Sequence, residues 1–279
     1  MKIPFLVKAD PNCIKERKDQ KVPFIIHQTM KSENVPINMY KAAKSWIDLN
    51  REYEYRFCND KKCSDFLLNN FPKRVYIAHS MLYAGAAKSD LWRLCVLYVH
   101  GGVYSDIDTI AKVPLSKIIK NDDDFISLKA KYLHKNITQK KIILQNAKIT
   151  NAFIATVPKH PLILETINNI VHKIFYLLNN KINQQKPQSI TGPLILGQTF
   201  NSLLKRNIWC EIKNKTYIIQ DKKVRLFLLS NKKYFDFRYE NYKNDCIKMN
   251  IKDYHGKNGS YAFYYDYAEM IYNKLTSKP

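Results

Sequence analysis

Along the first hundred residues, segments with the apolar spacing of a strand take turns with segments that have the apolar spacing of a helix. Short β-branched or period-two runs are typical of strands, and apolar residues three and four apart are typical of helices. A Gly-Gly pair at 101–102 follows the longest helical segment and is a common stop signal. The pattern predicts strands at 22–26, 53–57 and 103–105 and helices at 37–49, 62–68 and 78–100. This order is typical of an α/β protein with a Rossmann-like, mostly parallel central sheet flanked by helices.

The second half of the chain gives a coarser pattern. It predicts strands at 125–128 and 152–157, helices at 161–178, from Thr191-Gly-Pro193 onward and at 264–275, and a polar loop at 179–188. The segment before the last helix is aromatic and predicted to be poor in strands. We find neither an internal repeat nor a linker, so residues 1–279 are expected to form one domain.

Composition restricts the class of protein. With 46% hydrophobic and 25% charged residues the chain is expected to be globular. No run approaches the ~20 apolar residues of a membrane span, so no transmembrane segment is expected. The first residues lack the pattern of a signal peptide, and six cysteines without zinc-ligand spacing are typical of reduced thiols. Both features favour a soluble protein of the cytoplasm.

The net charge of +22 favours anionic ligands but not a specific nucleic-acid partner. Of the 46 basic residues 38 are Lys, and they are dispersed along the chain instead of forming an arginine-rich stripe. An excess of Lys, Asn and Ile is also what an A/T-rich genome produces. The charge therefore predicts salt-sensitive attraction to phosphate-bearing ligands or acidic surfaces.

Two pairs of charged residues are candidates for chemistry. Asp106 and Asp108 follow the predicted strand 103–105, and alternation points both carboxylates to one side, where they could hold Mg²⁺ or Mn²⁺. A solvated turn explains the same tripeptide. Asp90 and Arg93 lie three apart and share a helix face. They form either a surface ion pair or a grip for hydroxyl groups, because a carboxylate accepts and a guanidinium donates in fixed directions.

Residues 86–93 (AAKSDLWR) and 97–108 (LYVHGGVYSDID) together resemble the central block of glycosyltransferase family 32. This family contains sugar transferases with a DXD motif, including capsular polysaccharide enzymes and yeast α-mannosyltransferases. A related block occurs in the glucosyltransferase domains of large clostridial toxins. Further segments are similar to the family in order, and the resemblance runs from about 22 to 200: 22–28, 45–46 with 53–55, 151–155 with 160–161, and 191–193.

The resemblance implies a GT-A fold, with a nucleotide-sugar half at about 22–125 and an acceptor half at about 126–279. It implies a retaining hexosyltransferase that uses Mn²⁺ or Mg²⁺, a UDP- or GDP-sugar donor, and a glycan or protein-linked hydroxyl acceptor. The implied catalytic residues are Asp90, Arg93, Asp106 and Asp108. Asp108 would bind the metal directly, and Asp106 would contact both the metal and the donor. Asp90 and Arg93 would hold sugar hydroxyls, and His27 and Gln28 would border the nucleotide.

Some positions depart from the family pattern. Met30 stands where members often have a Trp that stacks on the base. Near the C-terminus we expect His255 to complete the metal shell and Ser260 and Tyr261 to contact the donor, although His255 could be an ordinary loop histidine.

Asn151 and Thr191 are expected on the acceptor side. A strand-end turn and a helix cap explain these two residues almost as well. Other readings of the same carboxylates are a metal-dependent nuclease or phosphodiesterase, which would need a second metal cluster, and a non-catalytic binding protein.

Overall fold

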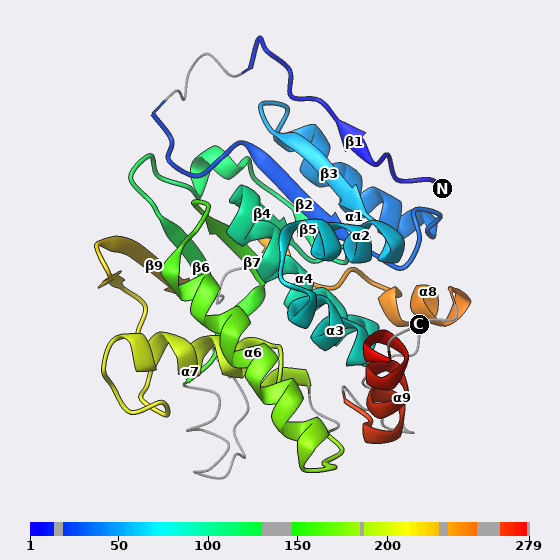
Figure 1. The fold of residues 1–279 in the computed structure, drawn as a ribbon. Coiled ribbons are helices and arrows are strands. Elements are labelled where there is room, and N and C mark those ends of the chain that lie inside the picture. Colours follow the sequence, from blue (N-terminus) through cyan, green and yellow to red (C-terminus); the bar gives the residue numbers. More distant parts are fainter. Residues whose placement is uncertain (14–18, 130–146, 185–186, 229–233, 250–262, 278–279) are drawn as a thin grey trace, which may run out of the picture.

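The computed structural model describes residues 1–13, 19–129, 147–184, 187–228, 234–249 and 263–277 (Figure 1). The helices are α1 (Ile37–Leu49), α2 (Asp60–Asn70), α3 (Lys73–Met81), α4 (Gly85–His100), η2 (Leu115–Lys117), α6 (Pro161–Asn179), η3 (Pro187–Ser189), α7 (Pro193–Leu203), α8 (Tyr242–Lys248) and α9 (Tyr265–Thr276). The strands are β1 (Leu6–Val7), β2 (Ile25–Thr29), β3 (Glu54–Cys58), β4 (Gly102–Ser105), β5 (Ile110–Ala111), β6 (Phe125–Lys129), β7 (Ile149–Thr156), β8 (Thr216–Ile219), β9 (Lys222–Leu228) and β10 (Phe235–Asp236).

The central sheet is mixed, which corrects the expectation of a mostly parallel one. Its order is β1-β3-β2-β4-β7-β6-β9-β8. The strands β3, β2 and β4 are parallel, as the alternation of strands and helices predicts. However, β7 is antiparallel to both β4 and β6, and β1 and β8 are antiparallel edge strands. Two strands that are connected through a helix are expected to be parallel. This expectation applies to β2, β3 and β4, which are connected through helices.

Helices cover both faces of the sheet, so the protein has a hydrophobic core on each side. On one side α3, α4, α6 and α9 pack together, and on the other side α1 packs beside β5 (Figure 1). Adjacent residues of β4 divide between the cores, with Val103 on the α1 side and Tyr104 on the α4 side. Burial on both faces of the sheet explains why Val103 and Tyr104, which point in opposite directions, are both large and largely apolar.

The predicted helix at 78–100 is two helices. The structure ends α3 at Met81 and begins α4 at Gly85, with extended backbone at Leu82 and Ala84. Leu82 is fully buried, so the apolar pattern continues across the break and conceals it. The consequence is functional, because the break places residues 83–86 in the wall of the cavity described below.

The segment predicted to be poor in strands contains the hairpin of β8 and β9. Gln220 and Asp221 at its turn both have positive φ, of 47° and 67°. Hairpin turns of this kind usually carry Asn-Gly or Asp-Gly, so Gln-Asp gave no signal. In addition, β8 is an exposed edge strand with only Ile219 buried, and it lacks the alternation by which strands are recognised.

Replacing Gly102 with Ala is expected to destabilise the protein by about 2–4 kcal/mol. Gly102 has a φ of 90°, and a Cβ there would lie 2.5 Å from the carbonyl oxygen of Ile25 in the neighbouring strand. The matched control is Gly85→Ala, where a Cβ meets nothing within 4 Å and the helical backbone is permissive. Urea unfolding of both variants checks the expectation, and equal stabilities would contradict it.

Candidate active site

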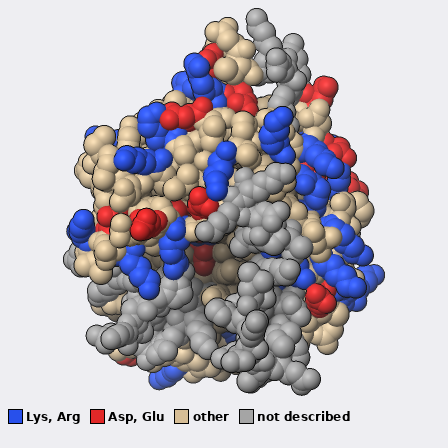
Figure 2. Space-filling view, turned by 180° about the vertical axis from the view of Figure 1, so that it is seen from behind, with Lys and Arg blue, Asp and Glu red and all other residues tan. Residues whose placement is uncertain are grey.

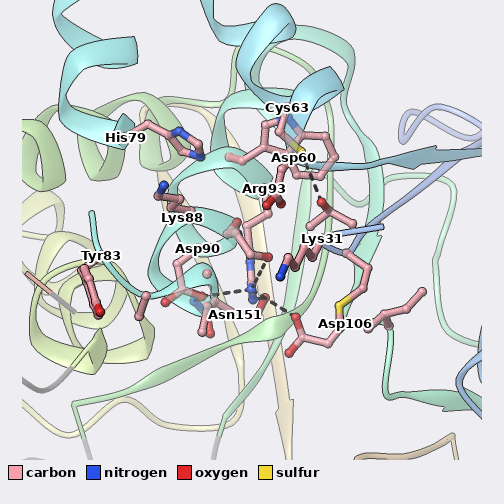
Figure 3. Close-up of a pocket in the computed structure, with 18 of the residues that line it drawn as sticks. Lys31, Asp60, Cys63, His79, Tyr83, Lys88, Asp90, Arg93, Asp106 and Asn151 are labelled. Atoms are coloured by element: carbon pink, nitrogen blue, oxygen red, sulfur yellow. Dashed lines mark hydrogen bonds and ion pairs between the residues drawn. The ribbon is translucent and has the colours of Figure 1, made fainter. Parts of the chain in front are cut away.

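Both carboxylates of the DXD motif lie at the carboxyl end of β4 and line a cavity of about 930 Å³. Figure 3 shows Asp106 in this cavity beside Arg93. The backbone of Asp106 is fixed from two sides. Its N–H donates to the carbonyl of Ala152 at 2.9 Å, and its carbonyl accepts from Nε2 of Gln28 at 3.2 Å. Viewed from behind, acidic side chains lie in a central hollow of the surface (Figure 2). The motif is therefore part of a concave site and not a solvated turn.

Arg93 joins the helix α4 to the DXD motif. Its Nη2 lies 3.0 Å from Oδ1 of Asp90 and 3.1 Å from Oδ1 of Asp106. Its Nη1 donates to the carbonyl of Asn151 at 2.7 Å. The guanidinium also lies over the ring of Tyr104, at 4.4 Å from the centroid. Because Arg93 is only 4% exposed, these contacts fix its position and leave little room for an alternative rotamer.

Asp90 is buried among hydrogen-bond donors. Its Oδ1 accepts from Nδ2 of Asn151 at 2.9 Å, and its Oδ2 accepts from the hydroxyl of Thr191 at 3.0 Å. Burial raises the pKa of Asp90 to about 6, although the charge of Arg93 opposes the shift. The structure thus places Asn151 and Thr191 beside Asp90, where they orient its carboxylate. Their predicted role on the acceptor side stays a prediction.

Asp108 is largely buried, and the pKa of its carboxyl is raised to about 7, first by burial and then by the charge of Asp106. Nε of Arg238 approaches its Oδ2 at 3.7 Å. Around the motif lie the carboxylates of Asp90, Asp106 and Asp108 and the guanidinium groups of Arg93 and Arg238. Carboxylates gathered in this way can bind a cation.

The available donors suit a hard divalent cation, because they are carboxylate oxygens. Oδ1 of Asp106 is already engaged by Arg93 and by the hydroxyl of Tyr104, which leaves its Oδ2 and the carboxylate of Asp108. Within the described ranges, no group of three or more His, Cys, Asp or Glu side chains could hold a metal ion. The site therefore fits an ion that takes its remaining ligands from a substrate or from residues elsewhere in the chain. His255, Ser260 and Tyr261 lie outside the described residues.

His27 and Gln28 lie within β2, not after it as the sequence predicted. His27 is 1% exposed and its Nε2 meets the carbonyl of Gly101 at 3.1 Å. Burial lowers the pKa of His27 to about 3, so the ring is neutral. Neither residue lines the cavity, whereas Met30 does. Gln28 instead connects Asp106 to Tyr55, whose hydroxyl donates to its Oε1 at 2.9 Å.

Several cavity residues were not anticipated. Tyr104 donates to Oδ1 of Asp106 at 3.0 Å, and Ser89 lies 3.0 Å from the Tyr104 hydroxyl. Both residues could have been found from the sequence, since Tyr104 shares a strand face with Asp106 and Ser89 precedes Arg93 by one helical turn. Arg238 could not have been found in this way, because it follows the DXD motif by more than a hundred residues. Lys31 and Lys88 also line the cavity (Figure 3).

Residues 36–125 match the family described as "Glycosyltransferase sugar-binding region containing DXD motif". This part of the chain is similar to that family, and it makes up 90 of the 279 residues. The sugar-binding region contains α1 to β4 and the residues Asp90, Arg93, Asp106 and Asp108. Its match confirms the resemblance to the DXD glycosyltransferases of family 32 that the sequence block indicated.

Several proteins with similar sequences have names that describe them as sugar transferases. The chain is 26% identical over 181 residues to a mannosyl phosphorylinositol ceramide synthase of Saccharomyces cerevisiae, covering 65% of this chain and 43% of that protein. It is 36% identical over 87 residues to inositol phosphoceramide mannosyltransferase 3 of Schizosaccharomyces pombe, covering 31% and 24%. An uncharacterized glycosyltransferase of Acanthamoeba polyphaga mimivirus is 27% identical over 191 residues, covering 67% of each. The chain thus spans less than half the length of the two yeast relatives.

Two solved structures resemble the fold. The PaToxG glycosyltransferase has a TM-score of 0.46 at 16% identity, covering 66% of this chain and 69% of that one. The ligand-free glycosyltransferase domain of the YGT toxin has a TM-score of 0.48 at 10% identity, covering 92% and 90%. Among the described residues, no helix is both long enough and apolar enough to cross a bilayer.

Proposed function

We propose that the chain is a metal-dependent glycosyltransferase that transfers a hexose from a nucleoside-diphosphate sugar to a hydroxyl acceptor with retention of configuration. The observation that carries the proposal is the hydrogen-bonded cluster of Asp90, Arg93 and Asp106 at one wall of the cavity that Asp108 also lines. The mixed α/β sheet, with the motif at the carboxyl end of β4, supports a GT-A type of fold.

Each residue of the cluster has a role in this proposal. Asp90, already oriented by Asn151 and Thr191, accepts hydrogen bonds from hydroxyls of the donor sugar. Arg93 holds Asp90 and Asp106 at a fixed separation, so that the sugar and the diphosphate are bound in register.

Asp106 and Asp108 would hold Mn²⁺ or Mg²⁺, which would supply positive charge to the leaving diphosphate. Lys31 and Lys88 add positive charge to the same cavity.

The sugar and the acceptor follow from the relatives only as proposals. Mannosyltransferases recur among the similar proteins, so mannose is the first hexose to test. The acceptor is a hydroxyl of a glycan, of a glycolipid or of a protein-linked sugar. The nuclease reading would need a second metal cluster in addition to the DXD carboxylates.

Mn²⁺ together with the correct nucleotide sugar is expected to raise the melting temperature by about 5 °C or more when the donor is at ~100 times its Kd. The same donor is expected to be hydrolysed slowly without acceptor, which release of free nucleotide measures. A panel of UDP- and GDP-sugars, each with Mn²⁺ and with EDTA, tests both expectations. A wild-type protein that neither binds nor hydrolyses any of these donors would overturn the proposal.

A further inference from the structure

The loop at residues 204–215, between α7 and β8, displays two large apolar side chains to solvent. Ile208 is 41% exposed and Trp209 is 40% exposed. By contrast, Trp46 and Trp92, the only other tryptophans of the chain, are fully buried. In Figure 1 the loop lies at the periphery beyond α7, on the opposite side of the molecule from α8 and α9, which contribute to the cavity. Its exposure is therefore unrelated to the sugar-binding site.

The backbone of this loop is held in a defined conformation. The buried side chain of Asn201 donates through Nδ2 to the carbonyl of Cys210 at 2.9 Å and to that of Ile208 at 3.3 Å. Oδ1 of Asn207 accepts from the N–H of Trp209 at 2.9 Å, and the N–H of Cys210 donates to the carbonyl of Asn207 at 2.8 Å. The buried side chain of Asn201 thus helps to fix the turn that carries Ile208 and Trp209.

The same loop carries several basic residues. Lys205, Lys213 and Lys215 are exposed, and Arg206 donates to the carbonyl of Glu211 at 2.7 Å. The carboxylate of Glu211 is paired with Lys129 at 3.0 Å, so it adds no unpaired negative charge. An exposed Trp on a loop with three exposed lysines matches the boundary of an anionic bilayer, where Trp lies at the headgroups and Lys and Arg attract phospholipid charge.

We propose that the loop at residues 204–215 is a docking site for the surface of an anionic phospholipid bilayer. Trp209 and Ile208 enter the interface, while Lys205, Lys213 and Lys215 lie against the headgroups. Ile208 favours a bilayer over a nucleic acid, because an aliphatic side chain gains by burial in acyl chains and offers no ring for base stacking. The association is peripheral and reversible, and it requires no membrane-spanning helix.

Trp209 is a built-in probe, since the other tryptophans are already buried. The full chain is mixed with vesicles of phosphatidylcholine and phosphatidylserine, with vesicles of phosphatidylcholine alone, and with a single-stranded oligonucleotide. We expect co-sedimentation and a blue shift of Trp emission with the anionic vesicles alone, both weakened by salt. Trp209→Phe should still sediment but lose the shift, and Trp209→Ala should bind about tenfold more weakly.

The charge contribution is tested by the variant K205E/K213E/K215E, which should weaken vesicle binding by about 100-fold or more. Its control is K41E/K73E/K117E, which changes the net charge equally at exposed lysines outside the loop. Equal weakening by both triple variants would overturn the proposal, because it would reduce the effect to net charge. A blue shift with the oligonucleotide and none with anionic vesicles would overturn it in favour of nucleic-acid binding.

Discussion

Asp108→Asn is expected to lower sugar transfer by about 1000-fold or more and, at the same time, to make the metal-free protein more stable. The loss of activity follows from removing one of the two carboxylates proposed to hold the cation beside the diphosphate. The gain in stability follows from burial, which raises the pKa of this carboxyl to about 7. Without the metal, the buried charge of Asp108 lowers the stability of the protein. A functional site is expected to retain such a residue, because activity requires it.

The sign of the pH dependence can be derived from this pKa. The pKa of this carboxyl is 3.8 in the unfolded chain and about 7 in the folded protein, so between these values the folded protein holds a proton that the unfolded chain has lost. The stabilising contribution is therefore complete below about pH 4 and is lost as the pH rises through about 7. At pH 8 the Asn variant should exceed the wild type by about 2–3 kcal/mol, and at pH 4 the difference should be near zero.

Urea unfolding at pH 4, 6 and 8 with EDTA measures this difference. Asp122→Asn is the control, since Asp122 is exposed, is paired with Lys223, and has a lowered pKa. Its replacement should leave stability nearly unchanged and should not reproduce the gain at pH 8. If Asp108→Asn is less stable than the wild type at every pH, the carboxylate is a structural residue and its role in metal binding loses its main support.

Features of the fold that depend on residues close together in the sequence were predictable. The helix predicted at 37–49 is confirmed to the residue as α1, whose apolar face is set by spacing within thirteen positions. The stop at Gly101 is also confirmed. Gly101 has a φ of 62° and its N–H donates to the carbonyl of Leu97, a conformation that glycine adopts without strain.

Features that depend on distant residues were not predictable. The direction of β7 is decided by its pairing with β4 and β6, for which no local pattern exists. Likewise, Arg238 reaches Asp108 only because β10 pairs with β5, so that the turn after β10 closes over the motif. His27 is buried within β2, where the carbonyl of Gly101 supplies its partner inside the sheet, and its place beside the nucleotide stays a prediction.

Arg93→Ala is expected to have the other large effect, destabilising the protein by about 3–5 kcal/mol. The variant removes the guanidinium that lies 3.0 Å from Asp90 and 3.1 Å from Asp106 and that donates to the carbonyl of Asn151. Most of the cost comes from leaving the buried carboxylate of Asp90 without its counter-ion. Urea unfolding measures the loss, and Arg93→Lys, which keeps the charge but not the planar fork, should be intermediate.

The origin of this cost can be separated from a general loss of packing by a double-mutant cycle. In the background of Asp90→Asn there is no buried charge to leave unpaired, so Arg93→Ala should cost at least about 1 kcal/mol less than in the wild type. Arg51→Ala is the matched control, because Arg51 pairs with Asp10 at 2.8 Å but is largely exposed, and its loss should cost less than about 1 kcal/mol. Strict additivity of Asp90→Asn and Arg93→Ala would mean that the two residues do not act as one unit. The proposed grip on the donor sugar would then have to rest on Asp90 alone.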